Sequence, residues 1–185
     1  MNIHLSLLDF ILAIGSSFLA SLAFLYFILR IYIPRISISQ HIIIRPDFEN
    51  PQETVYLFKI LNISWFSAYE VNIELTKLIK IPNSDNQMDV RITVLALKKN
   101  HLAHIPKHIS SKRIKKTHFA PHAILFRTSE DLEGILNDDS RSVELQVSLR
   151  HGLTGLSRVY KREFARPGAI CKGKEFKFGN DLGVE

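Results

Sequence analysis

The sequence predicts an all-β domain carried by one N-terminal membrane-spanning helix. Three observations lead to this fold class. Residues 10–29 form an uncharged apolar run, and about seven to eight short β-rich segments follow it between turn signals. The mean hydropathy is +0.05 although 23% of the residues are charged. A soluble chain with this charge content has a negative mean hydropathy, so the apolar run must raise the average.

The composition excludes several classes of protein. Hydrophobic residues make up 46% of the chain, which excludes a disordered protein. Cys171 is the only cysteine, which excludes a disulfide scaffold and a cysteine-based zinc site within one chain. The formal net charge of +6 belongs entirely to the chain after the apolar run, because Asp9 and Arg30 cancel each other.

Residues 10–29 predict a transmembrane helix. The run reads FILAIGSSFLASLAFLYFIL and lies between Asp9 and Arg30. As an α-helix it is about 30 Å long, the thickness of the hydrocarbon core of a bilayer. A cleaved signal peptide and a buried core helix are the alternatives. Residues 1–9 lack the Lys or Arg of a signal peptide, and the uncharged run is long for either alternative.

Small residues recur along this predicted helix at fourfold spacing. They form two neighbouring rows, Ala13, Ser17 and Ser21 in one and Ser16 and Ala20 in the other. Small residues at this spacing let two membrane helices approach closely, although such residues are common in any membrane helix. We therefore expect helix association and a homo-oligomer, with ordinary helix composition as the alternative.

The charges that flank the helix predict its orientation. No Lys or Arg precedes the run, whereas Arg30, Arg35 and Arg45 follow it. The positive-inside rule therefore places the N-terminus outside and residues 34–185 in the cytoplasm. We expect a single-pass protein of the cell inner membrane.

The remainder of the chain predicts strands, because Pro34 ends the helix and β-branched alternating segments follow. Residues 142–149, for example, place four apolar side chains on one face. A helical turn or two is predicted over residues 129–136, with Ser129 as the N-cap. This pattern predicts a β-sandwich or a small barrel. The predicted strands are residues 37–45, 54–63, 68–79, 90–97, 123–127, 142–149, 156–164 and 175–178.

Residues 98–122 are strongly basic and contain no Asp or Glu. A segment of this kind repels itself unless it meets anions. Three interpretations stay open: a solvated loop that keeps the protein soluble, contact with anionic membrane lipids, and contact with a nucleotide or nucleic acid. The candidate anion-contact residues are Lys98, Lys99, Lys107, Lys112, Arg113, Lys115 and Lys116.

Catalytic and metal-binding patterns are weak. His101, His104 and His108 share one face only if a helix forms, and Pro106 interrupts such a helix. No nucleophile elbow, phosphate-binding loop or paired-carboxylate motif occurs. We therefore expect no enzymatic activity, no metal and no cofactor. Trp65 and Phe66 are expected at the edge of the core, with a partner contact as the alternative.

Three longer segments carry a family resemblance. They are FKILNISWFSAYEVNIELTKL (58–78), THFAPHAILFRTSEDLE (117–133) and SVELQVSLRHGLTGLSRVYKREFARPGAICKGKEFKFG (142–179). Their motifs and order resemble the cytoplasmic domain of inward-rectifier potassium channels over residues 54–179. In the third segment the matching features are Glu144, the Gly152–Gly155 loop, and residues 160–164 and 173–176.

The resemblance implies an immunoglobulin-like sandwich that assembles as a tetramer beneath the membrane and responds to anionic lipids or nucleotides. The pore of that family needs two membrane helices and a Gly-Tyr-Gly filter. This sequence has one predicted membrane helix and no such filter, so it is not a potassium channel by itself.

The expected organisation has four parts: a flank and membrane helix (1–33), a connector with the first strand (34–53), the β-sandwich (54–179) and a C-terminal tail (180–185). We expect the cytoplasmic domain to sense an anionic ligand, lipid or partner and to couple it to helix oligomerisation. One alternative is a membrane-disrupting effector of bacterial antiviral defence, acting by abortive infection. A second is an accessory subunit of a membrane complex.

Overall fold

The computed structural model describes residues 7–31, 33–83, 88–152 and 155–185, and the chain divides into two units, residues 1–33 and 34–185. The first unit contains α1 (Leu7–Ile31), which confirms the predicted helix and extends it to 25 residues. Its segment Asp9–Ile28 is the one helical stretch in the described chain that is long and apolar enough to cross a membrane. This unit is compatible with a single-pass membrane protein.

The small residues of α1 lie along the helix as predicted. Ser16 Oγ donates to Ala13 O (3.0 Å), and Ser21 Oγ donates to Ser17 O (2.9 Å). Both hydroxyl groups therefore have partners within their own helix, so they do not need a second helix to satisfy them in an apolar medium.

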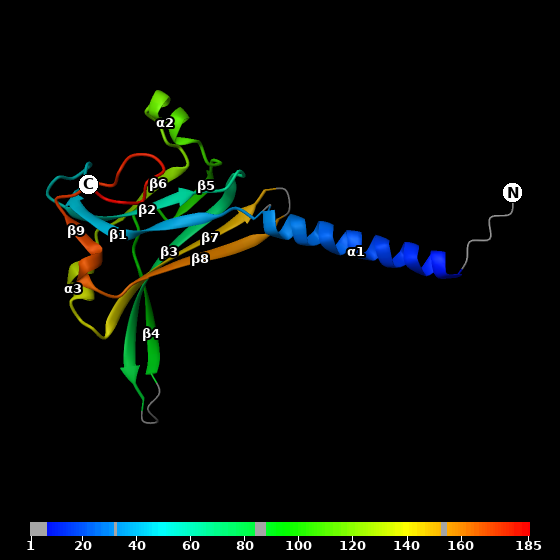
Figure 1. The fold of residues 1–185 in the computed structure, drawn as a ribbon. Helices are drawn as coiled ribbons and strands as arrows, with labels where there is room; N and C mark the ends of the chain where they lie inside the picture. Colours follow the sequence, from blue (N-terminus) through cyan, green and yellow to red (C-terminus); the bar gives the residue numbers. More distant parts are fainter. Residues whose placement is uncertain (1–6, 32, 84–87, 153–154) are drawn as a thin grey trace. The chain divides into compact units, whose positions relative to one another are not determined.

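The second unit is an all-β sandwich with nine strands in two sheets over the described residues (Figure 1). Both sheets have open edges and do not close on themselves. The domain is therefore a sandwich, and the alternative prediction of a small barrel is wrong. The first sheet has the strand order β6-β2-β1-β9, with β9 parallel to β1 and the other pairs antiparallel. Its strands are β1 (Ile36–Pro46), β2 (Thr54–Asn62), β6 (Ala123–Thr128) and β9 (Ile170–Lys172).

The second sheet has five antiparallel strands. Four of them follow the order β4-β3-β7-β8, and the fifth, β5, pairs with the start of β3. The helices of this unit are α2 (Ser111–Thr117), α3 (Leu132–Leu136) and a 3-10 turn (Pro167–Ala169). The strands are β3 (Ala68–Pro82), β4 (Met88–Leu95), β5 (His101–Ile105), β7 (Arg141–His151) and β8 (Ser157–Phe164).

The core lies between the two sheets and is built from the alternating apolar positions of the strands. Phe58 of β2 and Phe164 of β8 meet across the core with ring centroids 5.7 Å apart. Leu132 and Leu136 of α3 are fully buried, so this short helix closes one side of the core.

Several predictions on the second unit need correction. Residues 175–178 do not form a strand, and only an isolated bridge joins Phe176 to Val184. The N-cap of α3 is Asp131 rather than Ser129, and its carboxylate accepts from Gly134 N (3.0 Å). Residues 98–122 contain β5 and α2, which the residue pattern did not predict.

The two flanking segments of the predicted domain belong to the same unit as the sandwich. The strand of the expected connector, β1, is a central strand of the first sheet. The segment expected as a tail packs on it, because Ser39 Oγ donates to Leu182 O (2.9 Å).

Candidate functional site

Lys98 forms ion pairs with two carboxylates of the protein itself. Its ammonium group binds the Asp47 carboxylate and lies 2.7 Å from Glu53 Oε2. Arg127 Nη1 lies 2.7 Å from the other oxygen of Asp47, whose side chain is buried. The hydrogen bond from Lys98 holds the pKa of Asp47 below its ordinary value. Lys98 therefore ties the β1–β2 turn to the segment after β4, and we remove it from the anion-contact candidates.

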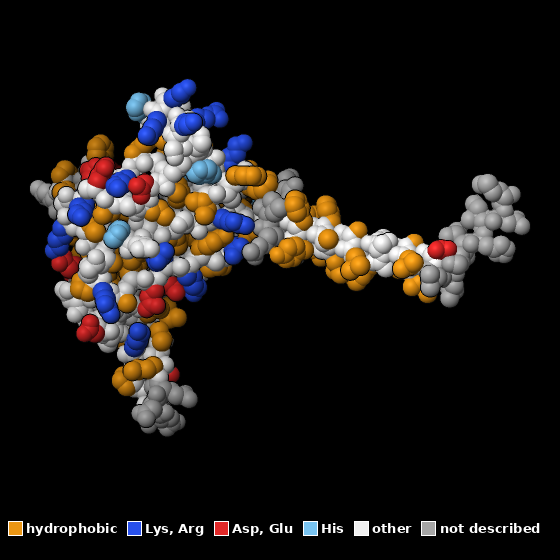
Figure 2. Space-filling model, viewed as in Figure 1, with side chains coloured by type: hydrophobic (Ala, Val, Ile, Leu, Met, Phe, Trp, Pro, Cys, Tyr) orange, Lys and Arg blue, Asp and Glu red, His pale blue; other side chains and the backbone are white. Residues whose placement is uncertain are grey.

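Four other candidate cations gather on α2, and we call Lys112, Arg113, Lys115 and Lys116 the α2 patch. All four side chains are exposed, whereas Ile114 between them is 2% exposed and packs beside Gly179. Figure 2 shows the Lys and Arg side chains projecting over this helix. Across the described ranges, no carboxylate lies within ion-pair distance of these four groups. The α2 patch is thus a cationic surface without an internal counterion.

A second surface surrounds Trp65, the residue expected at the core edge, and that expectation is wrong for its side chain. Trp65 is 82% exposed. It lines a groove of about 700 Å³ together with Phe66, Tyr69, Lys107 and Arg150. We call this surface the Trp65 groove.

Aromatic packing holds the walls of the Trp65 groove in place. The Phe66 ring meets His151 edge to face with centroids 5.5 Å apart, and the Tyr69 ring stacks on His104 at 6.0 Å. Arg150 pairs with Glu70 (3.1 Å), so Lys107 supplies the net positive charge. The groove therefore combines an exposed indole with a basic rim.

The Trp65 groove lies at the end of the domain where the chain first enters it. Ile63 N donates to Arg35 O (2.9 Å), and Tyr160 Oη donates to Pro34 O (2.7 Å). Trp65 follows Ile63 by two residues, so it lies close to Pro34, the first residue of the unit. Ile63 is 45% exposed and adds apolar surface at the same end. No alternating or helical sequence pattern includes Trp65. Only its position in a predicted turn could have indicated that its side chain is exposed.

A buried polar cluster joins the C-terminal segment to the sandwich. His122 is fully buried, and its Nε2 lies 2.5 Å from Asn180 Oδ1. The rings of His108 and His122 lie 5.1 Å apart. Lys59 of β2 is also buried, and its ammonium donates to the carbonyls of Lys177 (2.5 Å) and Asp181 (2.6 Å). These bonds hold residues 177–181 against the domain.

This cluster predicts loss of stability in mild acid. Burial lowers the pKa of His122 below its ordinary value of 6.5, and the neighbouring His108 and Lys59 lower it further. In the unfolded chain His122 therefore binds a proton more readily than in the folded protein. The free energy of unfolding decreases as the pH falls below about 6.5. We expect a lower Tm at about pH 5 than at about pH 7.5, with His122→Asn narrowing the difference.

The control for this prediction is His118→Asn, which changes an exposed imidazole. Burial also lowers the pKa of His151, so part of the difference remains in the His122 variant. A pH difference in Tm that is the same in His122→Asn and in the unaltered protein contradicts the assignment.

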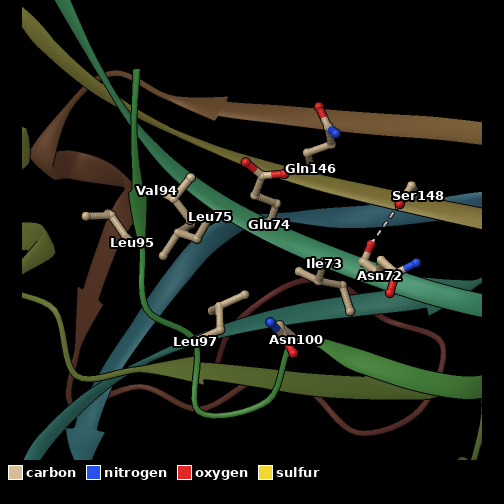
Figure 3. Close-up of a pocket in the computed structure, with 10 residues that line it drawn as sticks. All are labelled: Asn72, Ile73, Glu74, Leu75, Val94, Leu95, Leu97, Asn100, Gln146 and Ser148. Atoms are coloured by element: carbon tan, nitrogen blue, oxygen red, sulfur yellow. Dashed lines mark hydrogen bonds between the residues drawn. The ribbon is translucent and has the colours of Figure 1, made fainter. Parts of the chain in front are cut away.

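A pocket of about 360 Å³ opens where β4 leaves β3, and Figure 3 shows ten of its residues. Ser148 Oγ donates there to Asn72 O (3.3 Å). Glu74 is the only ionisable side chain among these ten, so they provide no pair of acid and base groups. It gives no support to a catalytic function.

The three histidines weighed as metal ligands are separated. His101 and His104 lie on strand β5, so the helix that would place them on one face with His108 does not form. His108 lies instead beside His122. In the described part of the chain no group of three or more His, Cys, Asp or Glu side chains is placed to hold a metal ion.

The fold and these surfaces define a β-sandwich protein with one N-terminal apolar helix. No protein-family model and no curated protein matches the chain. Among solved structures it is similar to the sporulation control protein Spo0M from Bacillus subtilis, with 8% identity and a TM-score of 0.38 over 71% of this chain and 48% of that one. The putative ApaA protein from Bordetella pertussis gives 12% identity and a TM-score of 0.31 over 72% of this chain and 91% of that one.

The chain thus spans about half the length of Spo0M. Both likenesses are too distant to indicate a function.

Proposed function

We propose that this chain is a single-pass inner-membrane protein whose cytoplasmic β-sandwich binds the anionic membrane surface and transmits that contact to its helix. The observation that carries the proposal is the exposed Trp65 at the end of the domain where the chain enters it. α1 ends at Ile31, and three residue steps of at most about 3.6 Å each separate Ile31 from Pro34. We propose that this end of the domain faces the lipid headgroups when α1 spans the bilayer.

The chemistry of the Trp65 groove suits a lipid headgroup region. Indole rings favour the boundary between hydrocarbon and water, because one part of the ring is apolar and the N–H needs a polar partner. Lys107 and the neighbouring Arg35 add positive charge, and each such group near an anionic leaflet contributes about 1 kcal/mol. Phosphate groups of the lipid are the anions that this rim would contact.

The α2 patch supports the same partner class. Four exposed cations without carboxylate partners in the described structure remain free to meet an anionic surface. Phe119 follows the helix and is 66% exposed, which adds an apolar side chain beside the charges. A nucleotide remains the other source of phosphate, but the α2 patch offers one aromatic ring and little to stack a base.

The helix is the second half of the proposal. A shallow groove on α1 is lined by the small residues Ala13, Ser17 and Ser21 together with Phe10, Ile14 and Phe18. A second α1 would approach closely at this groove, because small side chains leave room for backbone contact. We propose that headgroup contacts of the domain bias this association. The immunoglobulin-like relationship and the tetramer implied by it belong to the same proposal.

Trp65 is the only tryptophan in the chain, so its fluorescence tests the proposal directly. The full-length protein is reconstituted in vesicles with brominated phospholipids, with and without phosphatidylserine. We expect bromine to quench most of the Trp65 emission, and phosphatidylserine to increase the quenching at low salt. Replacing the four α2-patch cations by Gln should reduce this dependence on phosphatidylserine and salt.

The matched control moves the single tryptophan to the other end of β2. Phe48 lies in the β1–β2 turn and is 89% exposed, about 30 Å along the strand from the Trp65 end. The double substitution F48W/W65F should leave the emission nearly unquenched. Equal quenching in the two proteins, or none in either, overturns the proposed membrane-facing end.

A further inference from the structure

Strand β4 has an exposed apolar face and an open edge. It lies at the edge of the five-stranded sheet and pairs only with β3 within the described chain. Figure 1 shows β4 and the end of β3 extending beyond the other strands, and Figure 2 shows apolar side chains on these two strands. Four alternate residues are more than half exposed: Met88 (65%), Val90 (51%), Ile92 (64%) and Val94 (64%).

The same four residues carry the free backbone groups of this edge. Lys80 N donates to Ser140 O (2.8 Å), on the side of β3 that faces β7. Because N–H and C=O directions alternate along a strand, the odd-numbered residues of β3 point towards β4. Their register partners on β4 are also odd-numbered, as in Ile79 opposite Arg91. The even-numbered residues of β4 therefore point their N–H and C=O groups to the open edge.

An edge strand of this kind is normally covered or interrupted by charge, since it can pair with another chain. A bilayer does not fit as the cover, because the sequence that joins β3 to β4, NSDNQ at residues 83–87, is polar. A second copy of this strand fits, because the strand is complementary to itself in one antiparallel register.

We propose that β4 pairs antiparallel with β4 of a second copy about a two-fold axis at Val90. This register places Met88 opposite Ile92 of the second copy on the apolar face. It places Asp89 opposite Arg91 of the second copy on the other face, and the symmetry repeats this ion pair. The two five-stranded sheets then form one continuous sheet.

Charge selects this register over its neighbours. An axis at Arg91 sets two Arg91 side chains opposite each other, which is unfavourable. An axis at Ile92 sets Arg91 opposite Thr93 and Asp89 opposite Leu95, so neither charge has a partner. The Val90 axis alone pairs both charges and keeps the even-numbered residues in hydrogen-bonded positions. The pairing does not require the Trp65 groove to bind lipid; confinement by α1 in a membrane only raises the local concentration.

A cysteine at the two-fold axis tests the pairing in the full-length protein. In a Cys171→Ser background, Val90→Cys places two thiols at facing positions whose Cα atoms are about 5.5 Å apart, within the range of a disulfide. Mild oxidation of membranes should give roughly tenfold more disulfide dimer than Val159→Cys. Val159 is the matched control, because it is 50% exposed on β8 at the opposite edge of the same sheet.

A charge exchange then tests the register. In the Val90→Cys protein, Asp89→Arg or Arg91→Asp alone sets like charges opposite each other and should abolish most of the crosslinking. The double substitution D89R/R91D restores opposite charges and should restore the dimer. Asp89 also accepts from Asn83 Nδ2 (3.2 Å) within the same chain, so recovery in the double variant separates pairing from loss of this local bond.

Dimer yields that are equal in Val90→Cys and Val159→Cys overturn the proposal, and so does a double variant that fails to recover. Crosslinking of Val90→Cys to a different protein has the same consequence. None of these outcomes changes the expected quenching of Trp65, so the self-pairing and the membrane contact fail or succeed separately.

Discussion

Full-length protein that carries Phe18→Arg and Leu19→Arg should lose stable membrane integration. Both residues lie at the centre of the apolar segment Asp9–Ile28, and both side chains are exposed on α1. An arginine at the middle of a membrane helix costs about 2.5–3.5 kcal/mol, so two cost about 6 kcal/mol. Extraction of membranes with alkaline carbonate should leave the unaltered protein in the pellet and release the variant.

The control exchanges the same two residues, F18L/L19F, and preserves the apolar character. It should remain in the pellet. Carbonate release of the unaltered protein contradicts a spanning helix, and so does retention of the arginine variant. The mass of the membrane-bound protein tests the signal-peptide alternative, because a cleaved product lacks α1.

Phe58→Ala should strongly destabilise the sandwich. Phe58 is fully buried at the middle of β2 and contacts the Phe164 ring of the opposite sheet at 5.7 Å. Removing a buried phenylalanine side chain costs about 3–5 kcal/mol, because it loses apolar contacts and leaves a cavity. For a domain of this size the Tm should fall by about 10 °C or more, as measured by thermal denaturation.

Leu125→Ala is the matched control on the neighbouring strand. Leu125 is 46% exposed on β6, so its truncation should cost less than about 1 kcal/mol. Phe164→Ala, combined with Phe58→Ala, should be less destabilising than the sum of the two single changes, because both remove the same contact. Equal Tm values for Phe58→Ala and Leu125→Ala contradict a core shared by the two sheets.

Short-range sequence patterns were sufficient to predict the longer helices and strands. The uncharged run predicted α1, and alternation predicted β7, whose apolar side chains at residues 143, 145, 147 and 149 are all buried. Each of these signals repeats several times within one element, so a local pattern suffices. The nine-strand count exceeded the expected seven to eight, because β5 has five residues and β9 has three. The three residues of β9 contain too few repeats to be recognised, and β5 lies in the basic segment 98–122, where the composition did not indicate a strand.

The candidate surfaces depended on contacts between distant residues. Lys98 belonged to the basic segment by composition, yet its carboxylate partners come from the β1–β2 turn. Lys107 belonged to the same segment, yet it lines the Trp65 groove with residues of β3 and β7. Composition counts charges, but only the fold decides which of them already have a counterion.

The sequence by itself determined that one apolar helix precedes a β-rich, basic domain, because length, hydropathy and alternation are properties of neighbouring residues. The tertiary structure decided which side chains this arrangement leaves uncovered. Trp65 and the apolar residues of β4 are hydrophobic, and composition alone would assign them to a core. They are exposed because Trp65 lies in a turn at the domain's end and β4 extends past the strands that would cover it. Burial is set by packing between distant segments, which no local pattern contains.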